Sequence, residues 1–371
     1  MKFFRLPNSD NKISKLGLGF IGYNREIKNF LYHKKKNLKI INTALDLSIN
    51  FIDTADTYEN GFAEILLSEI TSKRRSELFI STKFSPLNNR YKDVIESADK
   101  SLKRLKIDKI DLYQIHWYNN SVSLNETLDA LSYLLDKKKI RYVGLSNFNL
   151  SQINKAIKIF YPNKILSIQN KMNLIIDQSK FDVDYFSNLN EQNIINIAYG
   201  VFLQKNYVLK KNQKELLITI SKKYNINYKQ IFLLWTYSHH KTLSLIRTSK
   251  LKNLLENINS STVQLSQSEL FDLNKLFSKK IEHIPVDRIK ILNTDADSTH
   301  KIYTTLKEAL SNPYKLKPDI NDLEKEIKEF KFKPVELIKK KNVYYLLQGR
   351  MRFWTWIYIN SYDSKIPAIV Y

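Results

Sequence analysis

Residues 50–61 read Asn-Phe-Ile-Asp-Thr-Ala-Asp-Thr-Tyr-Glu-Asn-Gly, a short apolar run that ends at an aspartate and passes into polar chain. The run has the composition of a buried β-strand, and the polar residues begin where that strand would end. Seven other runs of this kind occur along the chain. The eight expected strands are 13–20, 50–53, 78–83, 110–116, 140–146, 165–169, 194–199 and 243–247.

Segments with helical spacing of apolar residues lie between these runs. The clearest are 37–47, 62–70, 94–105, 124–135 and 213–223. Strands that alternate with helices form parallel sheets through right-handed crossovers, and eight such units close into a barrel. We therefore expect an α/β fold, a (β/α)8 TIM barrel.

Polar side chains end successive strands of this predicted barrel. Active residues of such barrels lie at the C-terminal ends of the strands. Any one of these polar residues could be a helix cap or a satisfied core group, but a complete series predicts a catalytic face. The series is Asp53, Lys83, His116, Ser146, Asn147, Gln169, Tyr199 and Arg247.

Several of these stretches resemble the aldo-keto reductase family. Residues 50–61 are similar to its signature around a catalytic Asp and Tyr five positions apart, and 81–84 to its lysine strand. Residues 101–117 and 139–148 resemble its histidine segment and the segment after it. The resemblance covers residues 13–275 and implies four catalytic residues, Asp53, Tyr58, Lys83 and His116.

The chemistry of these four residues is that of carbonyl reduction by hydride transfer. A phenol such as Tyr58 can donate the proton that the carbonyl oxygen needs, and it donates more readily beside a cation such as Lys83. Asp53 would hold the ammonium, and His116 would orient the substrate oxygen. A structural Asp–Lys pair beside a core Tyr and His is the alternative.

The resemblance implies a nicotinamide cofactor, NADPH, with NADH also open, because the sequence offers no flavin motif and no metal site. Ser146, Asn147 and Gln169 would bind the nicotinamide carboxamide, and the ring of Tyr199 would stack on the nicotinamide. The adenosine end would be held by a second group of residues. That group comprises Arg247 and Thr248 at the 2′-phosphate, and Glu256 and Asn257 at the adenine.

Three aromatic residues, Phe20, Tyr23 and Trp117, are expected to line the substrate pocket. Aromatic walls suit sugar rings and many other carbonyl compounds. The expected partner is therefore a small carbonyl or sugar-like molecule.

The pattern changes after Phe277, and we expect two domains, 1–278 and 282–371. The second domain resembles the small α+β ParB-like fold shared with sulfiredoxin. The resemblance rests on the strand-like residues 284–289 and 343–347 and on a helix that begins at 349. Further helices are expected over 298–311 and 320–330, and Phe353, Trp354, Trp356 and Tyr358 are expected in the core.

Gly349, Arg350 and Arg352 would form a phosphate cradle at the start of that helix. The cradle would take a nucleoside phosphate or a phosphorylated or nucleotide-linked substrate. A structural or docking role for the domain stays open. A nucleotide- or DNA-binding regulator with a cofactor-sensing barrel is the alternative for the whole chain.

The composition adds less. The formal net charge of +23 is compatible with binding to nucleic acid, because a basic surface attracts phosphate. However, lysine occurs together with asparagine and isoleucine along the whole chain, as the codon bias of an AT-rich genome would produce. The chain has no cysteine, which excludes disulfides and thiolate metal sites. Without an apolar leader or a long apolar run, the expected location is the cytoplasm, with no membrane span.

Overall fold

The computed structural model divides the 371-residue chain into two compact units, residues 1–205 with 209–277 and residues 206–208 with 278–371. Each unit is described by itself. The residues that the structure describes are 1–6, 11–20, 34–119, 121–160, 165–175, 183–203, 207–239, 241–277, 281–291, 303–313, 319–328, 334–340 and 343–370.

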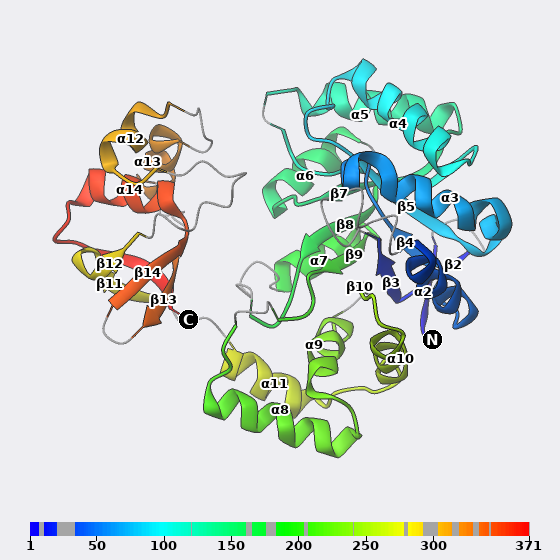
Figure 1. Cartoon of the computed structure of the whole chain (residues 1–371). Helices are drawn as coiled ribbons and strands as arrows, with labels where there is room; N and C mark the ends of the chain where they lie inside the picture. Colours follow the sequence, from blue (N-terminus) through cyan, green and yellow to red (C-terminus); the bar gives the residue numbers. More distant parts are fainter. Residues whose placement is uncertain are drawn as a thin grey trace. The chain divides into compact units, whose positions relative to one another are not determined.

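The first unit is a closed barrel of eight strands in the order β10-β3-β4-β5-β6-β7-β8-β9 (Figure 1). All neighbours are parallel, which confirms the predicted α/β barrel. The strands are β3 (Leu16–Gly19), β4 (Phe51–Asp53), β5 (Phe79–Phe84), β6 (Ile110–Ile115), β7 (Ile140–Ser146), β8 (Ile165–Lys171), β9 (Ile195–Tyr199) and β10 (Thr242–Ile246).

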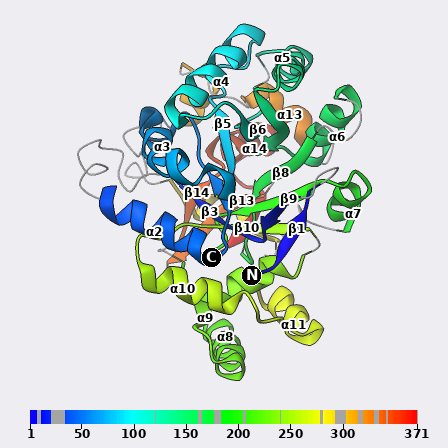
Figure 2. The ribbon, with the colours of Figure 1, turned by 90° about the vertical axis from the view of Figure 1, so that its right-hand side faces the viewer.

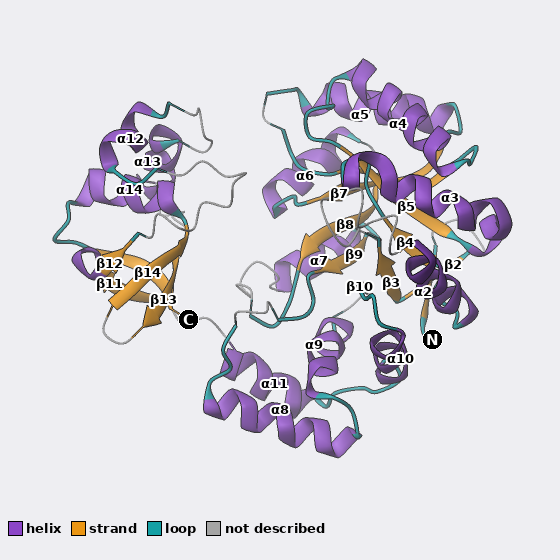
Figure 3. Cartoon of the chain, viewed as in Figure 1, coloured by secondary structure: helices purple, strands orange, loops and turns teal. Residues whose placement is uncertain are grey.

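Helices surround these strands (Figures 2 and 3). In α4, for example, the apolar side chains of Val94, Ala98 and Leu105 are buried on one face. The helices are α2 (Lys34–Asp46), α3 (Phe62–Arg74), α4 (Tyr91–Leu105), α5 (Leu124–Asp136), α6 (Leu150–Ile159), α7 (Val183–Glu191), α8 (Lys211–Tyr224), α9 (Tyr228–Tyr237), α10 (Leu251–Ser260) and α11 (Gln267–Phe277).

The expected single strand over 13–20 is wrong, because the chain turns at Lys15. The Ser14 hydroxyl donates to the carbonyl of Leu16 at 2.7 Å, a local bond that competes with a continuous ladder. Residues before the turn form β2 (Lys12–Ser14), which pairs antiparallel with β1 (Phe3–Arg5). Only β3 belongs to the barrel.

This hairpin closes the end of the barrel where the strands begin. Leu6 and Ile13 are buried in one cluster with inward residues of the strands. The strand residues of that cluster are Phe51, Phe79, Leu112, Leu166, Ile195, Ile197, Leu243 and Leu245. The opposite end, where the strands finish, carries the polar residues.

The second unit is an α+β structure with a five-stranded sheet in the order β11-β15-β13-β14-β12. The α-helices of this unit gather on one side of the sheet (Figure 3). Its assignment to the ParB-like fold stays a prediction. The elements are β11 (Ile281–Pro285), η4 (Val286–Arg288), β12 (Ile289–Lys290), α12 (Leu306–Ser311), α13 (Ile320–Lys328), β13 (Val335–Lys340), β14 (Val343–Gln348), α14 (Arg350–Asn360) and β15 (Lys365–Val370).

Two details of the second unit correct the sequence interpretation. The helix expected over 298–311 begins at Leu306, because the Thr305 side chain caps it by accepting a bond from the backbone N–H of Glu308; residues 298–302 lie outside the described ones. Phe353 and Trp354 are buried as expected, but Tyr358 is 52% exposed. Among the described residues, no helix is long and apolar enough to cross a membrane.

Gly17 and Gly19 in β3 offer a matched test of core packing. A methyl at Gly17 would lie 2.7 Å from Leu245 Cδ2 and 2.8 Å from Phe51 Cδ1, whereas one at Gly19 would meet only a carbonyl oxygen at 3.6 Å. We expect Gly17→Ala to lower the free energy of unfolding by about 1–3 kcal/mol and Gly19→Ala to change it little. Denaturant unfolding of both variants measures this, and equal effects would contradict the packing described.

Candidate active site

A buried ion pair joins the ends of β4 and β5. The ammonium Nζ of Lys83 lies 2.5 Å from Oδ1 of Asp53, and both residues are at most 3% exposed. Lys83 also donates to the carbonyl of Thr54 at 2.8 Å. Burial is the largest single effect on Lys83 and would lower its pKa, but the charges and hydrogen bonds of Asp53 and Tyr58 together outweigh burial and raise the pKa above its ordinary value. Lys83 is therefore a fixed cation.

The carboxylate of Asp53 is saturated by other donors. Its Oδ2 accepts bonds from Ser81 Oγ at 2.8 Å and Gln114 Nε2 at 3.2 Å, and its Oδ1 accepts one from Gln169 Nε2 at 3.2 Å. Gln114 was not singled out from the sequence. Its position two residues before His116, on the same side of a strand, could have identified it as an inward residue.

Tyr58 lies next to this pair, in the 3-10 turn η1 (Tyr58–Gly61) that follows β4. The Lys83 ammonium is 5.2 Å from the centre of the Tyr58 ring, and the ring of His116 meets it edge-on at 5.7 Å. Burial raises the pKa of Tyr58, and the charge of Lys83 opposes that rise. The phenol is therefore protonated at neutral pH and lies beside a cation.

The chain after Tyr58 is held in an unusual conformation. Glu59, Asn60 and Gly61 all have positive φ, at 46°, 54° and 88°. Non-glycine residues in this region are strained and persist only where surrounding contacts hold them. Here Arg104 packs against Gly61 and pairs through Nε with the buried carboxylate of Glu64 at 2.6 Å. This contact ties the Tyr58 turn to helices α3 and α4.

His116 follows β6 and faces the same space. Burial, and then the charge of Lys83, lower the pKa of His116 to about 4, so the imidazole is neutral at physiological pH. Its Nδ1 is buried and has no hydrogen-bond partner among the described residues. A neutral ring next to Tyr58 can bind a carbonyl oxygen without adding charge.

Three residues predicted to bind the cofactor, Ser146, Asn147 and Tyr199, form a hydrogen-bonded group next to His116. The Tyr199 hydroxyl donates to Asn147 Oδ1 at 2.6 Å, and Asn147 Nδ2 lies 3.0 Å from both Ser146 Oγ and the carbonyl of His116. Gln169, predicted to bind the same end of the cofactor, donates to Asp53 Oδ1 at 3.2 Å and accepts through Oε1 a bond from Gln114 Nε2 at 2.8 Å. Its amide is thus engaged within the protein.

The other predicted cofactor residues lie together after β10. Arg247 is exposed, and Thr248 Oγ1 accepts a bond from the backbone N–H of Lys250 at 3.1 Å just before α10. Asn257 is buried, and its Oδ1 accepts a bond from Gln230 at 3.1 Å. Glu256 faces Lys252 at 3.9 Å.

The structure describes two of the three residues predicted to line the substrate pocket. Trp117 is 48% exposed, and its ring stacks near that of His116 with centroids 6.4 Å apart. Phe20 is buried, and its backbone N–H donates to the carbonyl of Asp53 at 2.6 Å. Tyr23 lies outside the described residues.

The predicted cradle lies in the second unit. Gly349 has a left-handed φ of 96° and precedes α14. The guanidinium of Arg352 folds against Gly349, and its Nη1 donates to the carbonyl of Pro334 at 2.5 Å. Arg350 is half-buried at the first position of the helix.

A parallel eight-stranded barrel with polar residues at the ends of its strands is the architecture of TIM-barrel enzymes. Residues 15–277 match the sequence profile described as the Aldo/keto reductase family. The chain belongs to that family, as the sequence motifs predicted, and it is accordingly an oxidoreductase.

Individual relatives agree with this membership. Methylglyoxal reductase YeaE of Escherichia coli is 25% identical over 245 residues, 66% of this chain and 85% of that protein. Uncharacterized oxidoreductase YqkF of Bacillus subtilis is 33% identical over 187 residues, 47% of this chain and 57% of that protein.

Solved structures show the same barrel. The thermostable aldo-keto reductase Tm1743 superposes with a TM-score of 0.67 at 29% identity, covering 74% of this chain and all of that one. An aldo-keto reductase from Klebsiella pneumoniae in complex with NADPH gives a TM-score of 0.66 at 21% identity, over 74% of this chain and 95% of that one.

Proposed function

We propose that the barrel reduces a small carbonyl compound with NADPH, with Tyr58 as the general acid. The observation that carries the proposal is that the Tyr58 ring contacts both the Lys83 ammonium and the neutral ring of His116. NADPH supplies a hydride to the carbonyl carbon when it is bound. The residues of the chain supply the proton and the alignment.

The proton passes from the Tyr58 hydroxyl to the carbonyl oxygen as negative charge develops on that oxygen. The resulting phenolate is stabilised by the Lys83 ammonium, which Asp53 holds in place. In the reverse direction the same phenolate accepts the proton of an alcohol.

His116 positions the oxygen. A neutral imidazole can donate one hydrogen bond to it, and a pKa of about 4 keeps the ring in that form through the physiological range. Trp117, stacked beside His116 and half exposed, would form one wall of the substrate site. The name of the relative YeaE, a methylglyoxal reductase, supports a small carbonyl as substrate.

The donor set at the ends of β7, β9 and β10 fits NADPH. Tyr199 presents an aromatic ring at the end of β9, bonded to Asn147, and Ser146 lies beside them. Arg247 is exposed directly after β10, where a guanidinium can bind the 2′-phosphate. Thr248 would join Arg247 at the 2′-phosphate, and Glu256 and Asn257 would adjoin the adenine. Gln169, held beside Asp53, would bind the nicotinamide carboxamide.

Tyr58→Phe tests the general acid. The ring remains but the proton donor is lost, so we expect kcat to fall by about 10² or more while the Kd for NADPH changes little. Tyr113→Phe is the matched control, because that buried hydroxyl has no partner among the described residues and its removal should leave kcat unchanged. Stopped-flow turnover and fluorescence binding measure both quantities, and near wild-type kcat in Tyr58→Phe would exclude the assignment.

Arg247→Ala tests the cofactor choice. Loss of a charge-assisted bond to the 2′-phosphate should weaken NADPH by about 1.5–3 kcal/mol and leave NADH nearly unchanged. Lys222→Ala removes the same charge from an exposed position on α8 and should affect neither. Titration of each variant with both cofactors measures these affinities. Equal losses of affinity for NADPH and NADH would show that Arg247 does not bind the 2′-phosphate.

For the second unit we propose a phosphate cradle at Gly349, Arg350 and Arg352. The start of α14 supports it, since the guanidinium of Arg352 lies against Gly349 there and the first N–H groups of a helix favour an anion. Calorimetry of the NADPH-saturated chain with nucleoside di- and triphosphates should show heat that Arg350→Ala removes. If the heat is absent and the variant keeps full reductase activity, a docking or structural role is the better account.

A further inference from the structure

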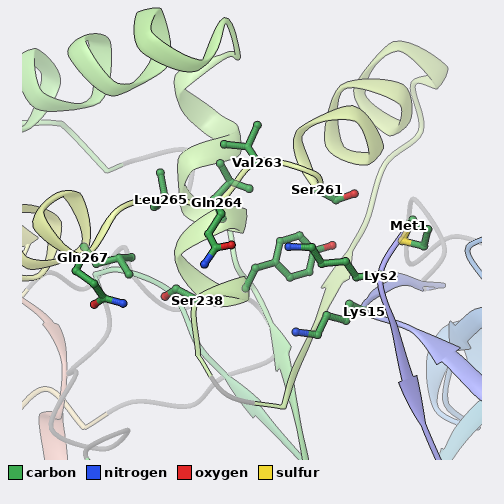
Figure 4. A pocket seen from close by; sticks show the side chains of 12 residues that line it. Met1, Lys2, Lys15, Ser238, Ser261, Val263, Gln264, Leu265 and Gln267 are labelled. Carbon is green, nitrogen blue, oxygen red and sulfur yellow. The ribbon is translucent and has the colours of Figure 1, made fainter.

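A cavity of about 190 Å³ lies at the end of the barrel where the strands begin, between the N-terminal hairpin and helices α9 and α11. Lys2 and Lys15 extend into it from the hairpin, toward Ser238 and Gln264 on the other side (Figure 4). The reductase residues lie at the strands' other ends, so this cavity is a separate feature.

The charge in this cavity is unbalanced. None of the described residues that line it is acidic, and neither lysine forms an ion pair within the described part of the chain. Lys15 is half-buried, with its ammonium 4.8 Å from the centre of the Phe4 ring. Burial, and then the charge of Lys2, lower the pKa of Lys15. Two like charges held together without a counter-charge favour a bound anion.

A buried hydroxyl adds a second, independent observation. The Tyr237 side chain lines the cavity, and its hydroxyl is buried with no hydrogen-bond partner among the described residues. An unpaired buried polar group costs about 1–3 kcal/mol, so native proteins rarely leave one without a ligand or water. The hydroxyl is a donor, as are both ammonium groups and the amide of Gln264.

From this donor set we infer that the cavity binds a small oxyanion, a phosphate or a short-chain carboxylate, between Lys2, Lys15 and Tyr237. The size agrees, because 190 Å³ is below the roughly 300–1,000 Å³ of pockets for drug-sized ligands. The apolar lining by Leu234, Leu265 and Leu270 could cover the short chain of a carboxylate. A bound anion would connect the hairpin to α9 and to the chain leading into α11, and so would stabilise this end of the barrel.

Site-specific protection of Lys15 tests the inference on the full chain. With NADPH present to fill the cofactor site, and at constant ionic strength, lysines are acetylated by a trace N-hydroxysuccinimidyl acetate ester and quantified by mass spectrometry. The probes are inorganic phosphate, propionate and the neutral propionamide. Lys92 and Lys103, exposed on α4, are internal controls in the same digest.

We expect phosphate or propionate to slow acetylation of Lys15 saturably, by about tenfold at ten times the Kd, with Lys92 and Lys103 unaffected. Protection by one of the two identifies the anion class. No protection by either anion, equal slowing of all lysines, or equal protection by propionamide would overturn the inference.

Tyr237→Phe provides a second test with little risk to folding, because the hydroxyl it removes has no hydrogen-bond partner in the described part of the chain. The variant should unfold at a higher temperature than the wild type without anion, since a desolvated hydroxyl is gone, and should bind the protecting anion about tenfold more weakly. Unchanged anion affinity would show that the hydroxyl is not a ligand and would refute the site as described.

Discussion

The buried pair between Asp53 and Lys83 is the interaction on which the rest of the barrel's chemistry depends. Two charges removed from water are tolerated only when each is fully bonded, and removing one partner of such a pair costs about 3–5 kcal/mol. Here the carboxylate accepts bonds from Lys83, Ser81, Gln114 and Gln169, which lie on three strands besides its own. The pair therefore fixes the mutual position of β4, β5, β6 and β8 at their C-terminal ends.

The same pair controls the electrostatics of the neighbouring groups. Because Lys83 stays charged, the proton of Tyr58 has a cation beside it, and the same charge adds to the effect of burial in keeping His116 neutral. The strained turn after Tyr58 is held by Arg104 and Glu64, so the phenol is placed by contacts outside the site as well as within it. One buried cation thus links the stability of the barrel to its proposed proton transfer.

Much of this could be predicted from the sequence, because the barrel strands are short apolar runs that end in polar residues. The four candidate catalytic residues lie in short motifs that can be recognised in the sequence. The structure brings these residues together, and their roles stay predictions. Gln114 escaped notice because its function arises only when three strands meet at Asp53. The turn at Lys15 could not be predicted, because it depends on a local hydrogen bond from the Ser14 hydroxyl to the Leu16 carbonyl. The pattern of apolar residues does not reveal such a bond.

The proposed proton transfer runs from the Tyr58 phenol to the substrate, beside the ammonium of Lys83. The most direct measurement replaces Tyr58 by a series of fluorotyrosines of decreasing phenol pKa and records the pH dependence of single-turnover hydride transfer. If Tyr58 is the proton donor, the fall in rate at high pH should move to lower pH in step with the phenol pKa. A fall that stays at the same pH throughout the series would contradict it.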